Sequence, residues 1–396
     1  MVRVRAIVNP ELLAWARKSS RFSLEEAAKK LRVPVERVMQ WESGFDRPTI
    51  AQLRRMADIY KRPLAVFYLP EPPKGFDAMR ISDFRTLPEA GEPEVSPQLA
   101  LEIRRAHQRR EVALFLASEL AQIGPELPTH IGVGDDPEQV AGQVRDYLGI
   151  ALEDQFSWLD PDVALKAWKT AIENVGILVF ETERVPLEEM RGMSIGERPF
   201  PVIALNGKDW PRGKIFTLLH EFTHVLLSQG GICDLRDGPR VSAVADTTEI
   251  FCNHVAGAAL VPKVALLRER LVAARPGQRE WRDEEIWDLS KRFSVSTEML
   301  LRRLVLIGAA REEFYRQKRK EFLAAYAEQR ERRRRYLKDK GGHPPYYRMV
   351  LRSNGIRYTK LVLEAYHDRY ITASDLSDYL NMRLKHLSAI WEAVLA

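Results

Sequence analysis

The first 70 residues repeat apolar positions at the spacing of short amphipathic helices. Ser23-Leu-Glu-Glu26 has the form of a capping box, in which the serine caps a helix and the third helical residue reaches back to it. We therefore expect a helix over 24–31 and, after a tight turn, a second helix over 35–43 that Gly44 ends. A further helix is expected from Pro48 to Tyr60. Two short helices around a tight turn predict a helix-turn-helix.

Proline and glycine are dense between residues 70 and 97, so a linker or an irregular arm is expected there. The chain after it shows helical periodicity over 97–123, 137–148 and 161–174. Two β-rich runs follow at 176–181 and 200–206, with a third strand candidate between them.

Helices are expected again over 212–228 and 247–259, and the chain after Pro262 has a helical pattern throughout. The predicted fold class is mainly α with a small β-sheet, an α+β architecture. The expected parts are a helix-turn-helix domain at 1–69, the linker at 70–97, a mixed domain with a helical lead-in at 98–310, a basic helix at 311–343 and a small C-terminal helical unit at 344–396.

His220-Glu-Phe-Thr-His224 is an HExxH motif within the expected helix 212–228. Residues four apart lie on one face of a helix, so both imidazoles can reach one metal ion. Glu221 projects beside them, where it can polarise a metal-bound water. The alternative is a helix with two surface histidines, but leucine and valine flank the motif and indicate a buried helix.

A third ligand is expected from the helix 247–259, and Glu249 is the best candidate, with Asn253 one turn further as its support. The alternative is a helix-start carboxylate capped by Thr247 or Thr248. Two histidines, a glutamate and a water form the open tetrahedral site of a hydrolytic zinc, and manganese or iron are alternative ions. Cys252 lies nearby, where core packing is favoured over thiolate ligation.

The segment Phe216–Leu227, together with Glu249-xxx-Asn253-xx-Ala-xx-Ala-Leu-Val-Pro262, resembles the ImmA/IrrE metallopeptidases. The similarity extends over roughly residues 165–310. Further similar segments are Arg191-Gly-Met-Ser194, the edge-like strand ending at Asn206, and Leu289–Leu304.

This resemblance implies that His220, Glu221, His224 and Glu249 form the site of a zincin-like minimal metallopeptidase core. It also implies an intracellular setting and selective protein substrates, often transcriptional repressors cut at one position.

In the expected mechanism Glu221 takes a proton from water and passes it to the leaving amine. The strand 201–206 is expected to hold an extended substrate by backbone pairing. Arg191 and His254 are candidates for stabilising the developing oxyanion.

The run Val38-Met-Gln-Trp-Glu-Ser-Gly44, with Arg47-Pro-Thr after it, resembles the Xre/Cro/lambda-repressor class over residues 10–66. Its second helix would enter the major groove of DNA. There Gln40 could read adenine, and Arg37 a guanine or a phosphate. The exposed positions of this helix are expected to be Glu36, Arg37, Gln40 and Ser43. Glu36 departs from a purely basic reading face, and a helix-turn-helix used only for protein contacts is the alternative.

The formal net charge of +6 is unevenly distributed over the 396 residues. Residues 1–70 carry +7, residues 71–310 carry −9, residues 311–340 carry +6, and the remaining 56 carry +2. Basic ends suit the nucleic-acid backbone, but for the basic run within 312–340 a solvated helix face with internal Glu–Arg pairs is the slightly favoured interpretation.

Localisation and partners are inferred from what the composition lacks. Two cysteines indicate no disulfide framework. No apolar run approaches the ~18 residues of a membrane span, and the first residues lack a secretion signal, so a cytoplasmic protein with no membrane partner is expected. The C-terminal unit is a candidate binding module or homo-oligomer contact.

The expected function is a DNA-binding regulator carrying a zinc endopeptidase. Its substrate is expected to be a specific protein, a transcriptional repressor, cleaved in a stress or phage-related response. One alternative is a transcriptional regulator whose peptidase fold is a sensor, and another is one half of a toxin–antitoxin-like complex that acts by binding. The HExxH motif with Glu249 favours the active endopeptidase over the sensor, since a site that had lost its activity would have no need to keep Glu221.

Overall fold

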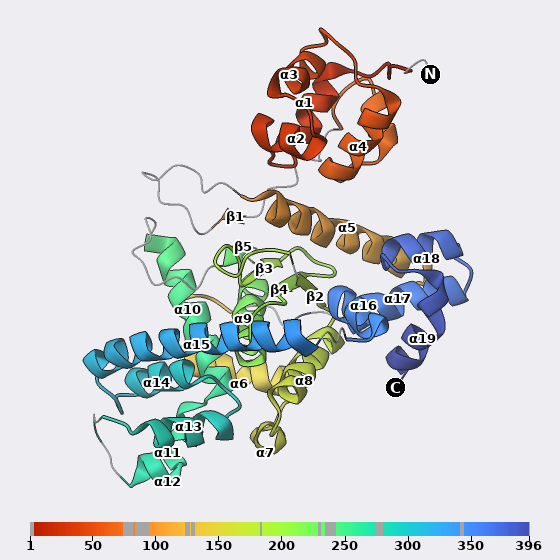
Figure 1. Ribbon diagram of the computed structural model, residues 1–396. Helices are drawn as coiled ribbons and strands as arrows, with labels where there is room; N and C mark the ends of the chain where they lie inside the picture. Colours follow the sequence, from red (N-terminus) through yellow and green to blue (C-terminus); the bar gives the residue numbers. More distant parts are fainter. Residues whose placement is uncertain are drawn as a thin grey trace. The chain divides into compact units, whose positions relative to one another are not determined.

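A computed structural model of the chain divides into two compact units (Figure 1). The first comprises Met1–Ile81 and Ala90–Gln108, and the second comprises Ser82–Glu89 and Arg109–Ala396. Helices dominate and one small β-sheet is present, which confirms the predicted fold class. The structure describes residues 4–73, 82–83, 95–122, 127, 131–182, 184–228, 231–233, 243–274, 277, 280–340 and 344–395. The expected linker lies mostly outside these residues, and the boundaries between the five expected parts stay a prediction.

Helices are the main elements of the first unit's described residues, and an isolated antiparallel bridge joins Arg5 to Thr49. The expected capping box forms: the N–H of Glu26 donates to Ser23 Oγ at 3.1 Å, and the N–H of Ser23 donates to the Glu26 carboxylate at 3.0 Å. The elements are α1 (Pro10–Lys18), α2 (Leu24–Leu31), α3 (Val35–Glu42), α4 (Ile50–Tyr60), the 3-10 helix η1 (Leu64–Tyr68) and the first part of α5 (Pro97–Glu119).

An ion pair that sequence patterns did not reveal ties α1 to α3. Arg17 Nε and Nη2 donate to the two Glu42 carboxylate oxygens at 2.7 and 2.9 Å. Both side chains are about nine-tenths buried, with 9% and 10% exposed. Because the guanidinium fork fits a carboxylate in one plane, this pair fixes the orientation of α3 on α1.

The second unit is built on a mixed sheet with strand order β1-β5-β3-β4-β2. β4 pairs in parallel with β2 and antiparallel with β3, and β3 pairs antiparallel with β5. The strands are β1 (Ser82–Asp83), β2 (Leu178–Thr182), β3 (Gly192–Ile195), β4 (Val202–Asn206) and β5 (Gly231–Cys233). The three expected strands are therefore present, together with two short ones.

The expectation that the strand at 201–206 is edge-like and free to pair with a substrate is wrong. β4 is hydrogen-bonded on both sides, and all five of its residues are buried. A continuous apolar run identifies a buried strand. It does not tell which strands will flank it, because that depends on the crossovers that connect them.

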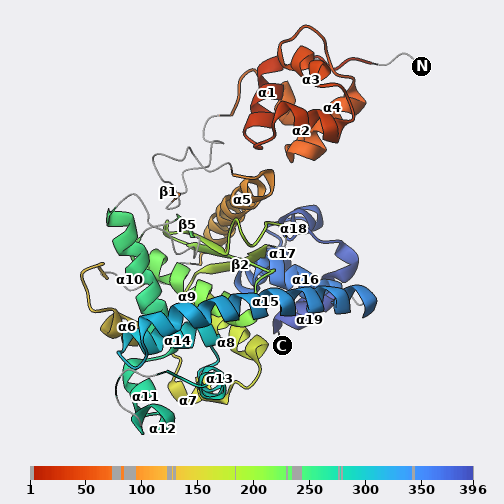
Figure 2. The same ribbon diagram turned by 60° about the vertical axis from the view of Figure 1, so that its left-hand side comes forward.

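Helix α9 (Pro211–Leu226) packs on β3 and β4 and lies between α8 (Pro161–Asn174) and α10 (Ala243–Leu260), as Figure 2 shows. α6 (Pro137–Leu148) in turn packs on α10. α10 begins four residues earlier than the sequence pattern predicted. The helices that complete this part are α7 (Leu152–Ser157), α11 (Lys263–Arg268), α12 (Arg270–Ala273), α13 (Asp283–Arg292), α14 (Thr297–Leu306) and α15 (Glu312–Lys340).

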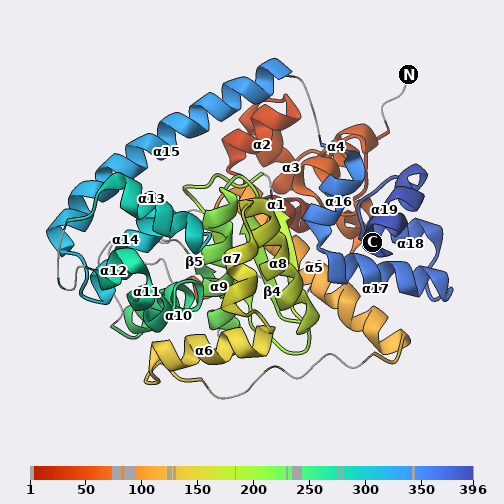
Figure 3. The same ribbon diagram turned by 90° about the horizontal axis from the view of Figure 1, so that it is seen from below.

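The long helix α15, whose course Figure 3 shows, carries Glu–Arg pairs between exposed residues. Arg316 pairs with Glu312 at 3.3 Å and Arg332 with Glu328 at 2.6 Å, both at i, i+4 spacing. These are the contacts that the solvated-face alternative predicts for this basic segment. Residues 341–343, the last three of the expected basic helix, lie outside the described residues.

Helices α16 and α17 of the C-terminal part pack on β2, the edge strand at the other end of the sheet from β1. Gly355 has φ +72°, and a side chain there would collide with the Val179 carbonyl. Arg352 reaches Glu181 on β2 with an N–O distance of 2.7 Å. The elements are α16 (Tyr346–Asn354), α17 (Ile356–His367), α18 (Ala373–Tyr379), η2 (Leu384–His386) and α19 (Leu387–Leu395). Among the described helices, none is both long and apolar enough to cross a membrane.

Candidate functional site

Helix α9 carries the HExxH motif in its second half. Pro211 stands in its first turn, where a missing N–H costs no helical hydrogen bond. His220, Glu221 and His224 are all fully buried, at 0% exposed. The Nε2 atoms of the two histidines lie 3.2 Å apart, so their shared face of the helix points both imidazoles at one position.

Glu249 on α10 completes the group. Its Oε2 lies 3.4 Å from His220 Nε2, and its Oε1 lies 3.1 Å from His224 Nε2. A tetrahedral zinc with bonds of about 2.0–2.1 Å separates its ligand atoms by about 3.3 Å. The three donor atoms therefore have the spacing that such an ion requires. Across the described ranges, these three residues form the only cluster of His, Cys, Asp or Glu able to hold a metal.

The charge state of this group also suits a cation. Burial raises the pKa of Glu249, but hydrogen bonds from His220 and His224 outweigh it and hold that pKa well below its usual range. Cys252, in contrast, has its pKa raised, first by burial and then by the charges of Glu249 and Glu221. A protonated thiol that is 0% exposed among apolar residues fits the core-packing interpretation.

Strand β3 holds the Glu221 carboxylate in place. Ser194 Oγ donates to Glu221 Oε2 at 2.8 Å, and both groups are buried. Gly192 lies so close to α9 that a Cβ there would be 2.8 Å from Glu221 Oε1. Sequence reasoning did not assign either residue a role, although both belong to the segment Arg191-Gly-Met-Ser194 that carries part of the family resemblance.

The two residues expected to stabilise the oxyanion, Arg191 and His254, each contact an acidic residue outside the metal-ligand group. Arg191 pairs with Asp209 at 3.2 Å, and His254 Nε2 lies 3.3 Å from Glu138. His254 is five positions after Glu249, which at about 100° per residue turns it away from the ligand face of α10. Asn253 stands one turn after Glu249, and its Oδ1 has no hydrogen-bond partner among the residues that the structure describes. Its supporting role therefore remains a proposal.

The predicted DNA-reading residues lie on or directly after α3. Glu36, Arg37 and Ser43 are exposed, and Gln40 is half-buried. The guanidinium of Arg37 pairs with Asp46 at 2.5 Å. The same stretch also exposes two apolar side chains that sequence reasoning did not single out, Met39 at 52% and Phe45 at 85%.

Fold and site together define a two-part protein, with a DNA-binding helix-turn-helix and a metallopeptidase-type domain. Comparison with known families agrees. Residues 172–305 match the peptidase family described as the IrrE N-terminal-like domain, and residues 13–67 match the family described as helix-turn-helix. Neither the curated proteins nor the solved structures gave a significant match. The chain thus joins an IrrE-like peptidase domain to a helix-turn-helix domain, which confirms the resemblance predicted from its sequence.

Proposed function

We propose that this protein is a cytoplasmic, zinc-dependent endopeptidase that cleaves one specific protein and is brought to DNA by its helix-turn-helix. The observation that supports it most directly is the triangle of donor atoms from His220, His224 and Glu249. A buried carboxylate, Glu221, stands beside that triangle without belonging to it. This is the arrangement of an open catalytic zinc site rather than a closed structural one.

In the proposed mechanism His220, His224 and Glu249 would hold the ion. Zinc, when bound, supplies Lewis-acid activation of water and of the peptide carbonyl. Glu221 accepts the proton of the attacking water on its carboxylate and delivers it to the leaving amine. Ser194 donates to Oε2 and thereby fixes which way the carboxylate faces.

We place the extended substrate on the β3 side of the sheet. β3 contacts Glu221 directly, and one of its two neighbours is the short strand β5, whereas β4 is paired over its whole length with β2. β5 already pairs with β3 from Gly192 to Ser194, so substrate binding is expected to displace β5. Hydrogen exchange on the Glu221→Gln variant tests this, because amides of Gly231–Cys233 should exchange faster with substrate bound. Unchanged or slower exchange there would contradict the placement.

The proposed substrate is a transcriptional repressor, and the setting a stress or phage-related response. The support is the presence of a helix-turn-helix domain and an IrrE-like peptidase domain on one chain. The test is to purify the protein, measure its metal content and incubate it with candidate repressors. We expect cleavage by the wild type, none by Glu221→Gln with zinc retained, and full cleavage by Glu313→Gln, an exposed glutamate on α15.

Proteolysis that persists in Glu221→Gln would contradict the assignment of Glu221 as the general base. A stable partner that co-purifies and stays uncleaved by the wild type would favour a binding protein of the toxin–antitoxin kind.

For the DNA half, we propose that Gln40 contacts a base and that Arg37 contacts a guanine or a phosphate. Arg37 now pairs with Asp46, so a phosphate must replace that carboxylate. Asp46→Asn should therefore tighten DNA binding in gel shifts, and Asp58→Asn, an exposed change on α4, should not. Equal effects of both variants would show only a general gain in charge.

A further inference from the structure

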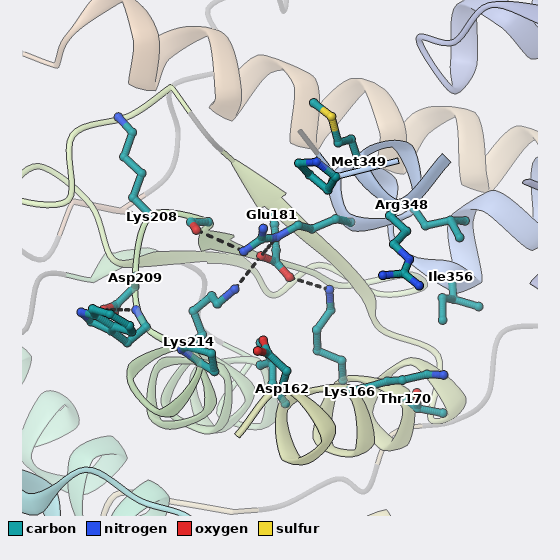
Figure 4. Close-up of a pocket in the computed structure, with 18 of the residues that line it drawn as sticks. Asp162, Lys166, Thr170, Glu181, Lys208, Asp209, Lys214, Arg348, Met349 and Ile356 are labelled. Atoms are coloured by element: carbon teal, nitrogen blue, oxygen red, sulfur yellow. Dashed lines mark hydrogen bonds and ion pairs between the residues drawn. The ribbon is translucent and has the colours of Figure 1, made fainter. Parts of the chain in front are cut away.

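A large cavity lies away from the metal ligands, between α8, β2, the turn into α9 and α16. Its volume is about 1230 Å³, which is ample for a small-molecule ligand. Figure 4 shows Glu181 in its interior and basic side chains around it. The six basic residues of the lining are Lys166, Lys169, Lys208, Lys214, Arg348 and Arg352.

Three of these cations share one carboxylate. Lys169 Nζ lies 2.9 Å from Glu181 Oε1, while Lys214 Nζ and Arg352 Nε lie 2.9 and 2.7 Å from Oε2. Lys214 and Glu181 are 2% and 4% exposed, and Lys169 is 14% exposed. One negative charge therefore stands against three positive charges, two of them well removed from water.

The other three cations have no acidic partner among the described residues. Lys208 donates to the carbonyls of Arg184 and Val185, and Arg348 donates to the Tyr347 hydroxyl at 3.2 Å. Lys166 forms no ion pair in the part of the chain that the structure describes. All three are exposed. They are therefore available to a ligand at little cost in lost contacts.

The remaining acidic residues of the lining do not balance this charge. Asp209 pairs with Arg191, and Glu331 pairs with Arg335. Glu173 accepts the backbone N–H of Arg357 at 3.1 Å, and burial raises the pKa of this carboxyl, which favours its neutral form. None of these partners lines the cavity, so among the lining acids only Asp162 remains besides Glu181.

The lining also has an apolar part. Leu165, Trp210, Met349, Leu351 and Ile356 contribute to it beside the lysines and arginines. Such a mixed wall suits a ligand with several negative charges on one end and an apolar or aromatic body on the other. A chain of nucleic acid is a poorer fit, because the basic groups surround a cavity rather than follow a groove.

We propose that this cavity binds a phosphorylated small molecule of the nucleotide type. Its phosphates meet Lys166, Lys208 and Arg348, and its body lies against the apolar wall. The ligand would join α16 to α9, the helix that bears His220 and Glu221. This inference does not depend on the proposed peptidase activity, since binding can be measured without any substrate.

The test uses the full chain and three probes: ADP, pyrophosphate and adenosine. Calorimetric titration and thermal unfolding are expected to show binding of ADP and pyrophosphate and little binding of adenosine. Binding of ADP alone would mean that the nucleoside body is required. Zinc content is measured after each titration, because phosphates can also extract a metal and lower stability for that reason.

Lys166→Gln, Lys208→Gln and Arg348→Gln should each weaken ADP binding about tenfold, or about 1.4 kcal/mol. These residues are exposed, so the variants should fold. Lys385→Gln, an exposed lysine outside the cavity in the same unit, is the matched control and should bind as the wild type does. Absence of ADP and pyrophosphate binding at millimolar concentration overturns the proposal, as does an equal loss in the control.

Discussion

Gly192→Ala tests the close packing of β3 on the HExxH helix. A Cβ at this position would lie 2.5 Å from Thr217 Cγ2 and 2.8 Å from Glu221 Oε1. Carbon atoms in ordinary contact are about 3.5–4.0 Å apart, so the structure must yield by about 1 Å. Thr217 is β-branched and buried, and the Glu221 carboxylate is held by Ser194, so neither can simply turn away.

Overpacking of this kind costs about 1–3 kcal/mol. We expect the unfolding transition of the second unit, followed by calorimetry, to lose stability in that range. Zinc content should stay near wild type, because the ligands stand on α9 and α10 and do not touch Gly192. Cleavage should fall by up to about 100-fold, the effect of displacing a catalytic group by roughly 1 Å.

Gly142→Ala is the matched control. Gly142 is exposed within α6, and a Cβ there meets nothing within 4 Å. The same substitution should therefore stabilise the protein by about 0.5–1 kcal/mol.

Thr217→Ser removes the methyl group that collides with the new Cβ, so it should restore part of the stability lost in Gly192→Ala. The double-mutant cycle measures this coupling. If Gly192→Ala proves as stable as the wild type, or if Thr217→Ser shows no coupling to it, the reasoning about β3 and α9 is refuted.

Three further predictions concern single side chains. Ser194→Ala should lower the cleavage rate about tenfold while zinc stays bound, because Glu221 loses the hydrogen bond that orients it; an unchanged rate would remove Ser194 from the site. Arg17→Met should destabilise the helix-turn-helix by roughly 3 kcal/mol in urea unfolding, because it leaves the buried Glu42 carboxylate without its partner; a loss under about 0.5 kcal/mol, typical of surface pairs, would contradict this. Burial raises the pKa of Glu181, but the three cations around it outweigh that effect and hold it well below its ordinary 4.5. The stabilisation from ionised Glu181 is therefore complete above about pH 4.5, its ordinary pKa, and is lost as the pH falls further below that value. The stability difference between wild type and Glu181→Gln should be constant near neutral pH and shrink in acid, and a difference that grows in acid would reverse the sign of the argument.

Local patterns in the sequence predicted many of the helices and strands correctly. The capping box at Ser23, the helix boundaries of the first unit and the buried apolar strands all depend on residues within one or two turns of each other. The HExxH spacing is local in the same sense, because a single helix sets the distance between His220 and His224. Glu249 stands on another helix, where its position made it the best candidate for the third ligand, and the family resemblance strengthened that assignment.

What the sequence left undecided depends on contacts between distant segments. The sequence of β4 predicts a buried strand, but the position of β4 between β3 and β2 depends on how the connecting segments pack. Nothing in the local sequence distinguishes Ser194, and only the sheet brings it to Glu221, 27 residues further along the chain. Glu181 meets Lys169, Lys214 and Arg352 only because α8, α9 and α16 converge on β2. Hydrophobic periodicity records whether a residue is buried and not what it is buried against, so only the tertiary structure could determine these contacts.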